Sequence, residues 1–265
     1  GHATREAAEA VRQQVLEVIA ERMSVSIEDL ALVDGVVQVK GEAGEFAALR
    51  TEYIKEHRGY VDHPEGEFLT FREASRIAFL ERGAIVGVGK YRPPPLGGSY
   101  KGAAVGTSPA YGCSAQVVEL DVDLQTGKIK VLSMVDAHDC GFAINRTSVE
   151  GQMQGSLCMG LGEALYEEVK FGDRGQLLNA NLAEYKIPTA MDMPNVDTIV
   201  VESHEPNGPF GAKEVGEGAI MPTIPALLNA VYDATGVRFE ELPLTPERVL
   251  MGIRGRQEAV TEDGE

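Results

Sequence analysis

Hydrophobic residues recur with helical spacing in the first part of the chain. The first such run repeats every four residues and predicts an amphipathic helix: Val11, Val15, Ile19 and Met23. Segments 45–59 and 70–83 predict two further helices, each ended by a glycine. Ser26, three residues before Asp29, is typical of another helix start.

Alternation of apolar and polar residues predicts the strands. Asp34-Gly35 interrupts alternating β-branched residues within 31–41, which indicates a hairpin, and 84–89 indicates a single strand. The clearest hairpin joins 115–123 to 128–139, and a last strand is expected at 199–204.

Two helices are expected in the second half, at 148–169 and 222–236. The first contains four glycines: Gly151, Gly155, Gly160 and Gly162. Each interior glycine costs roughly 1 kcal/mol relative to alanine, so we expect a close neighbour on that face of the helix.

The order of these elements predicts an α+β fold, with antiparallel sheets and packed helices rather than a doubly wound nucleotide-binding sheet. We expect a first α+β subdomain at 1–90, a second at 91–255 and a frayed polar tail at 256–265. The Pro- and Gly-rich segment 91–114 is either a linker between the subdomains or a functional loop.

Composition narrows the class of protein. The 265 residues carry a formal charge of −17, which argues against binding to nucleic acid or to an acidic membrane surface. No apolar run is long enough for a membrane span. The three cysteines are widely spaced, which favours free thiols, a reducing cytoplasmic location and no metal site formed by the chain itself: Cys113, Cys140 and Cys158.

The candidate chemistry lies in two glycine-containing segments. In GPFGAKEVGEG (208–218), Glu214 and Glu217 sit in a loop whose glycines permit close backbone approaches. Glu217 is either a chemical group or the partner of Lys213 in a structural ion pair. Gln152, between Gly151 and Gly155, is either a surface amide or a hydrogen-bonding ligand of an uncharged group.

Two other motifs carry less weight. GAIVGVGKY (83–91) has the wrong spacing for a phosphate-binding loop, and Tyr91 replaces the required Ser or Thr. The sequence His138-Asp139-Cys140 is interpreted as a strand end rather than a ligand cluster, because adjacent strand residues point to opposite faces.

The two longest motif blocks resemble one known family. AHDCGFAINRTSVEGQMQGSLCMGLGEALYEE and GPFGAKEVGEGAIMPTIPALLNAVYDATGVRFEELPLTPERV are similar to the C-terminal part of the molybdopterin-binding subunit in the xanthine dehydrogenase and aldehyde oxidase family. The resemblance extends from about Gly1 to Val249. GTSPAYGCSAQ, AHDCG and GPFGAKE look most like the large subunit of 4-hydroxybenzoyl-CoA reductase.

This resemblance implies specific roles. Glu217 matches the family glutamate that acts as a base beside the molybdenum, and Glu214 matches a variable position. Gln152 with Gly151, and the run Gly211, Ala212 and Lys213, match cofactor-contacting positions. The implied activity is a molybdenum-dependent oxidoreductase acting on an aromatic, heterocyclic or aldehyde substrate, or a reductive dehydroxylase of the hydroxybenzoyl-CoA type.

The resemblance also implies partners. The cofactor is molybdopterin or its cytosine dinucleotide, and the N-terminal half of such a subunit, as a separate chain or as the remainder of this one, would complete its site. Iron–sulfur clusters and FAD are expected on partner subunits, because the chain has no cluster-binding cysteine set. The alternative is a non-catalytic scaffold or assembly paralogue of the same fold.

Overall fold

The computed structural model describes residues 1–39, 69–93 and 110–262. The chain forms two compact units, Gly1–Pro94 and Pro95–Glu265. None of the described helices is long and apolar enough to cross a membrane. The helix expected at 45–59 and most of segment 91–114 lie outside the described residues.

The first unit packs two helices against a small sheet. Its elements follow in the order α1 (His2–Met23), η1 (Ile27–Asp29), β1 (Leu30–Val33), β2 (Val36–Val39), β3 (Leu69–Thr70) and α3 (Phe71–Arg82). The strands form an antiparallel sheet in the order β1-β2-β3. Thr70 and Glu73 form a capping box at the start of α3, and Gly83 ends it. The expected first helix, hairpin and helix at 70–83 are thus confirmed; the predicted start at Ser26 caps only a short 3-10 helix, η1.

Segment 84–89 does not form the strand that its alternation predicts. It runs extended along α1, where Gln14 Nε2 donates to the Val86 carbonyl at 2.9 Å. A Cβ at Gly87 would collide with the Ala7 carbonyl, and one at Gly89 would collide with that of Ala3. The glycines therefore serve close packing on a helix rather than strand formation.

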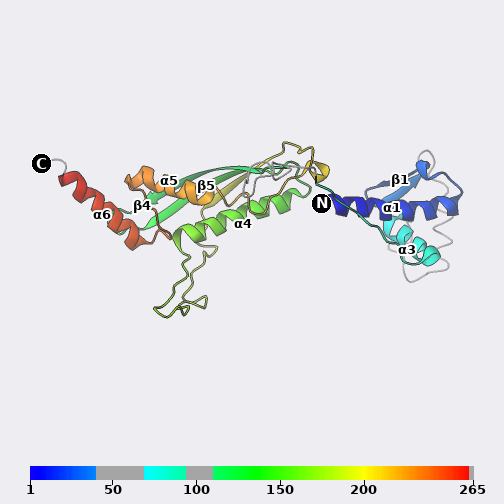
Figure 1. Cartoon of the computed structure of the whole chain (residues 1–265). Coiled ribbons are helices and arrows are strands. Elements are labelled where there is room, and N and C mark those ends of the chain that lie inside the picture. The colour runs from blue at the N-terminus through cyan, green and yellow to red at the C-terminus, as the bar shows by residue number, and fades with distance from the viewer. Residues whose placement is uncertain (40–68, 94–109, 263–265) are drawn as a thin grey trace, which may run out of the picture. The chain divides into compact units, whose positions relative to one another are not determined.

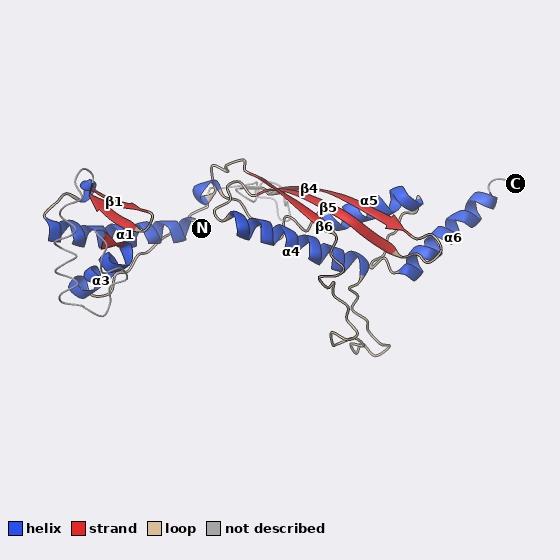
Figure 2. Ribbon diagram, turned by 180° about the vertical axis from the view of Figure 1, so that it is seen from behind, coloured by secondary structure: helices blue, strands red, loops and turns tan. Residues whose placement is uncertain are grey.

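The second unit contains a larger sheet (Figure 1). Its elements are β4 (Cys113–Val122), β5 (Ile129–Asp139), α4 (Arg146–Leu165), β6 (Asn195–Val201), η2 (Pro209–Gly211), α5 (Thr223–Thr235) and α6 (Pro246–Glu262). The predicted hairpin is confirmed as the antiparallel pair β4 and β5. β6 pairs with β5 in parallel, with Asp139 opposite Val201, so this sheet is mixed rather than purely antiparallel (Figure 2).

Helices α4 and α5 pack on one face of this sheet. Met134 of β5, Leu157 and Leu161 of α4 and Leu227 of α5 form one buried cluster. The expected neighbour of the α4 glycines is present at one end only: a Cβ on Gly160 would lie 2.5 Å from Thr223 Cβ, at the start of α5. At the other end, Gly151 and Gly155 face open space.

Helix α6 is the last element of the second unit and packs against α5. Val249 and Ile253 pack with Val231 of α5 in a separate buried cluster. The helix continues to Glu262, into the segment expected to be a polar tail.

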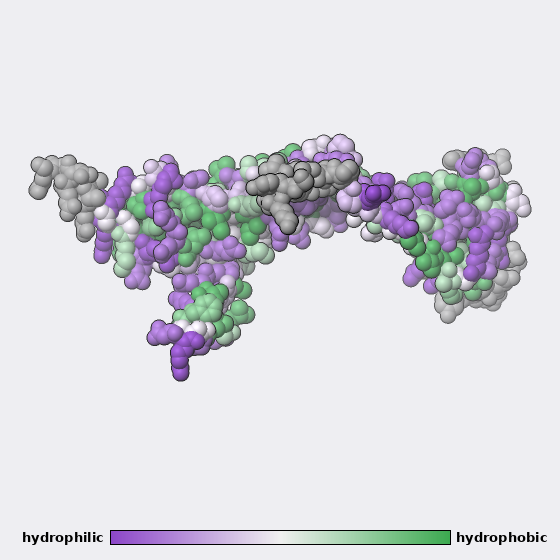
Figure 3. Space-filling view, in the orientation of Figure 1, coloured by the Kyte–Doolittle hydropathy of each residue, from purple (hydrophilic) through white to green (hydrophobic). Residues whose placement is uncertain are grey.

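Residues 166–194 leave the body of the unit between α4 and β6 and form an arm (Figure 1). Within the arm, an isolated antiparallel bridge pairs Phe171 with Leu177, and Tyr185 Oη donates to Glu167 Oε2 at 2.7 Å. Figure 3 shows hydrophobic residues gathered on the arm and hydrophilic ones at its outer end.

Candidate cofactor-binding site

The site is built where β5 and β6 end. Because these strands are parallel, segments 140–145 and 202–222 leave the same edge of the sheet and meet there. Lys213 N donates to the Cys140 carbonyl at 2.7 Å, and His204 N donates to that of Gly141 at 2.8 Å. Gly141 has φ 73°, and a Cβ on it would lie 2.9 Å from Lys213 N. Only glycine permits so close a contact between the two segments.

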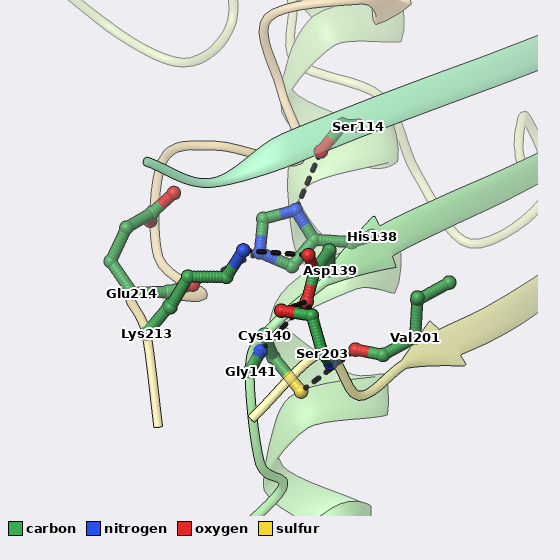
Figure 4. Close-up of polar contacts among 9 residues, drawn as sticks. All are labelled: Ser114, His138, Asp139, Cys140, Gly141, Val201, Ser203, Lys213 and Glu214. Atoms are coloured by element: carbon green, nitrogen blue, oxygen red, sulfur yellow. Dashed lines mark hydrogen bonds and ion pairs between the residues drawn. The ribbon is translucent and has the colours of Figure 1, made fainter. Parts of the chain in front are cut away.

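Asp139 anchors both segments (Figure 4). Its Oδ2 accepts from Lys213 Nζ at 2.6 Å, and its Oδ1 accepts from Ser203 Oγ and from Gly141 N, each at 2.9 Å. Burial alone would raise the pKa of Asp139, but hydrogen bonds from Lys213, Gly141 and Ser203 outweigh it and lower the pKa to about 2. Lys213 is thus the ion-pair partner of Asp139, and the alternative pairing of Lys213 with Glu217 is not the one found.

His138 connects the sheet to the glycine loop. Its ring is fully buried, with Nδ1 2.5 Å from Ser114 Oγ and Nε2 3.0 Å from the Glu214 carbonyl oxygen (Figure 4). A carbonyl can only accept, so Nε2 carries a proton and donates it to the Glu214 carbonyl, while Nδ1 pairs with the Ser114 hydroxyl. The strand-end interpretation of residues 138–140 is therefore correct for the backbone, but it missed the contacts of the side chains.

The two glutamates of the loop are both exposed, but their contacts differ. Glu214 Oε2 accepts from Gly218 N at 3.3 Å, and a Cβ on Gly112 would lie 2.5 Å from Glu214 Oε1. The carboxylate of Glu214 therefore serves the loop itself. Glu217 is exposed, and it forms no ion pair with the residues that the structure describes.

A shallow cavity of about 190 Å³ brings together three of the residues singled out from the sequence: Gln152, Ala212 and Lys213. Phe142 and Val149 supply part of its apolar wall. Gly151 lies beside Gln152 on the exposed face of α4, and Gly211, at φ 85°, precedes Ala212.

The chemistry of this surface fits the edge of a pterin cofactor. Gln152 offers amide donors and an acceptor, and with no Cβ on Gly151 or Gly155 a planar group can approach the helix closely. The ammonium group of Lys213 is held by Asp139, so Lys213 contributes its stem to the cavity. The described residues contain no group of three or more His, Cys, Asp or Glu side chains that could hold a metal ion.

Sequence reasoning missed the supporting residues of this site. Asp139 and His138 could have been predicted as supporting residues. Two polar residues at the end of an apolar strand indicate that their side chains form contacts where the sheet ends. Ser156 and Gln116, which also contact the loop, carry no such signal in the sequence.

The sequence of this chain matches the profile of a known protein family. The profile of the molybdopterin cofactor-binding domain family matches residues 1–194. The chain belongs to this family. It therefore carries a molybdopterin cofactor-binding domain, and the molybdenum cofactor predicted from the sequence is confirmed.

Relatives with assigned functions agree. The chain is 34% identical over 207 residues to the xanthine dehydrogenase molybdenum-binding subunit of Escherichia coli O157:H7, which covers 77% of this chain and 26% of that protein. It is 29% identical over 263 residues to the nicotine 6-hydroxylase large subunit of Paenarthrobacter nicotinovorans, covering 96% and 28%. The chain thus spans about a quarter of the length of these relatives.

A solved structure shares the fold. Quinoline 2-oxidoreductase from Pseudomonas putida 86 superposes with a TM-score of 0.65 at 25% identity, over 93% of this chain and 28% of that one. The α+β architecture predicted from the sequence is therefore confirmed, and quinoline 2-oxidoreductase shares it.

Proposed function

We propose that this chain forms the C-terminal part of the molybdenum-binding subunit of a xanthine dehydrogenase-type oxidoreductase, with Glu217 as its catalytic base. The observation that carries the proposal is the contrast between the two loop glutamates. The Glu214 carboxylate accepts a hydrogen bond within the loop, whereas the exposed Glu217 carboxylate forms no ion pair with the described residues and stands on a backbone held on both sides.

The chemistry of the site assigns different roles to the cofactor, to Glu217 and to Gln152. When bound, the molybdenum cofactor supplies the two-electron redox chemistry. Glu217 would take up the proton released in the reaction through its carboxylate oxygens. Gln152 would hold the cofactor through its amide, and the glycines on either side of it would let the cofactor approach α4.

The substrate class is an aromatic or heterocyclic compound or an aldehyde, and a hydroxybenzoyl-CoA-type reductive dehydroxylation belongs to the same proposal. Support comes from the names of the relatives, which include enzymes acting on xanthine, nicotine and quinoline. In this proposal the enzyme is cytoplasmic and works with an iron–sulfur subunit and an FAD subunit.

The remainder of the molybdenum-binding subunit would complete the cofactor site. The cavity beside Gln152 is too small and too open to enclose a pterin, and the chain spans about a quarter of its relatives. The arm at 166–194 offers the apolar surface that such a partner would cover.

The test is Glu217→Gln in the natively purified complex. We expect turnover to fall at least a hundredfold, the contribution typical of a general base, with molybdenum and pterin content unchanged. Glu240→Gln, which changes an exposed carboxylate outside the loop, should leave turnover as it was. Full turnover in Glu217→Gln would rule out the base, and a complex without molybdenum would favour the scaffold alternative.

A further inference from the structure

Three side chains from three different elements hold the backbone around Glu217. His138 Nε2, on β5, donates to the Glu214 carbonyl at 3.0 Å. Ser156 Oγ, on α4, donates to the Gly216 carbonyl at 3.1 Å. Gln116 Nε2, on β4, donates to the Ala219 carbonyl at 2.6 Å.

These side-chain contacts take the place of the backbone hydrogen bonds that a helix or strand would provide. Residues 214–219 lie in no strand or helix, so their carbonyls need partners from elsewhere when the loop packs against the sheet. The donors are placed by regular elements, and two of them are well shielded from water: His138 is fully buried and Ser156 is 6% exposed. Buried hydrogen bonds of this kind fix a loop more firmly than exposed ones.

The order of the accepting carbonyls matters for Glu217. Gly216 directly precedes Glu217, and Ala219 follows it by two residues, so both ends of the peptide segment that carries the carboxylate are held. The carbonyl of Glu217 itself accepts from Ile220 N at 3.2 Å. Little besides the side-chain torsions of Glu217 is left free.

Gln116 is itself held in place. Its Nε2 also lies 3.1 Å from Asp136 Oδ1, and Asp136 is fully buried. Burial raises the pKa of Asp136, although the hydrogen bond from Gln116 and the nearby His138 act in the opposite direction. The pair forms a buried polar link across the β4–β5 hairpin that ends at the loop.

We propose that Gln116, His138 and Ser156 are positioning residues that fix the backbone of the 214–219 loop and thereby aim the carboxylate of Glu217. This inference rests on the proposed function of Glu217. It predicts that loss of one donor lowers kcat with little change in KM, because a displacement of about 1 Å at a reacting group can reduce rate a hundredfold.

Ser156→Ala tests the proposal in the natively purified complex with two measurements. Amide hydrogen exchange of residues 214–219 should accelerate about tenfold, since one buried hydrogen bond is lost. The kcat should fall about ten- to a hundredfold, with KM within twofold and molybdenum and pterin content unchanged. Ser156→Thr keeps the hydroxyl and should restore both measurements.

The matched control is Ser75→Ala. Ser75 Oγ donates to the Phe71 carbonyl at 2.7 Å on α3, so this variant removes a similar hydrogen bond far along the sequence from the loop. It should change neither exchange in 214–219 nor kcat. Unchanged exchange and unchanged kcat in Ser156→Ala would overturn the proposal.

Two further variants separate the possible failures. Gln116→Met removes the hydrogen-bond donor to the Ala219 carbonyl but keeps a side chain of similar volume. If the complex does not assemble with Ser156→Ala, the same two measurements on Gln116→Met test the positioning role. Glu217→Gln should leave exchange in the loop unchanged. An active Glu217→Gln refutes the base, and faster loop exchange in Ser156→Ala would then still establish that the donors fix the loop. An inactive Glu217→Gln beside a fully normal Ser156→Ala refutes only the positioning role.

Discussion

Lys213 Nζ lies 2.6 Å from Asp139 Oδ2, and this ion pair joins the glycine loop to the end of β5. The side chains are 6% and 17% exposed, so water screens the pair little. Asp139 also accepts from Ser203 and Gly141, and it thereby connects the end of β5 to segment 202–222, which is distant in the sequence. The pair is therefore a structural support of the site rather than a reacting group.

Lys213→Met is expected to destabilise the full chain by about 3 kcal/mol, because it leaves the Asp139 carboxylate largely buried without its cation. The measurement is urea denaturation followed by circular dichroism, since the chain contains no tryptophan. Adding Asp139→Asn to this variant should recover part of the loss. A double variant less stable than Lys213→Met would contradict this account of the pair.

The same pair predicts a response to acid. The pKa of Asp139 is lowered to about 2 in the folded chain from an ordinary value near 3.8, so its contribution is fully present above about pH 4 and is lost as pH falls toward 2. The shift corresponds to about 2 kcal/mol. Comparing unfolding at pH 5 and pH 2.5 should show this loss in the native chain and not in Asp139→Asn. Equal losses in both would place the acid sensitivity elsewhere.

Local patterns were sufficient for most elements of the fold. The period of Val11 to Ile19, the Asp34-Gly35 turn and the alternation around Gln125 each depend on neighbours in sequence, and the structure confirms the helix and both hairpins. The alternation at 84–89 led to a wrong prediction of a strand. The glycines there allow close packing against α1, and no local pattern in the sequence reveals that contact.

The site was predictable only in part. Gln152, Ala212 and Lys213 were singled out through motifs, and the structure places them around one cavity, while their role toward the cofactor stays a prediction. The parallel pairing of β5 with β6 could not be read from the sequence, since 55 residues separate Asp139 from Asn195. That pairing brings Asp139 to Ser203 and Lys213, which explains why the supporting contacts were missed.

The glycines of α4 provide a matched pair of substitutions. Gly160→Ala should destabilise the chain by about 1–3 kcal/mol, because its Cβ would lie 2.5 Å from Thr223 Cβ in a packed contact between helices. Gly155→Ala meets nothing within 4 Å, and it should stabilise the chain by up to about 1 kcal/mol through helix propensity. Thermal unfolding of the two variants side by side measures both effects. Equal destabilisation by both would refute the packing argument.

The arm at 166–194 gives a prediction about assembly. Several of its apolar side chains are strongly exposed, among them Leu182 at 73% and Met191 at 92%. Apolar residues gathered on a projecting segment mark an interaction surface, and an aspartate placed among them would have to be desolvated in the complex.

Leu182→Asp should therefore abolish co-purification with the remainder of the molybdenum-binding subunit, while changing the stability of the chain by less than about 0.5 kcal/mol. Leu124→Asp is the control, because Leu124 is 54% exposed in the turn between β4 and β5, outside the arm. Native affinity purification of both variants, with quantification of the bound partner and of molybdenum, makes the comparison. If Leu182→Asp retained the partner as fully as Leu124→Asp, the arm would not be the surface through which the cofactor site is completed.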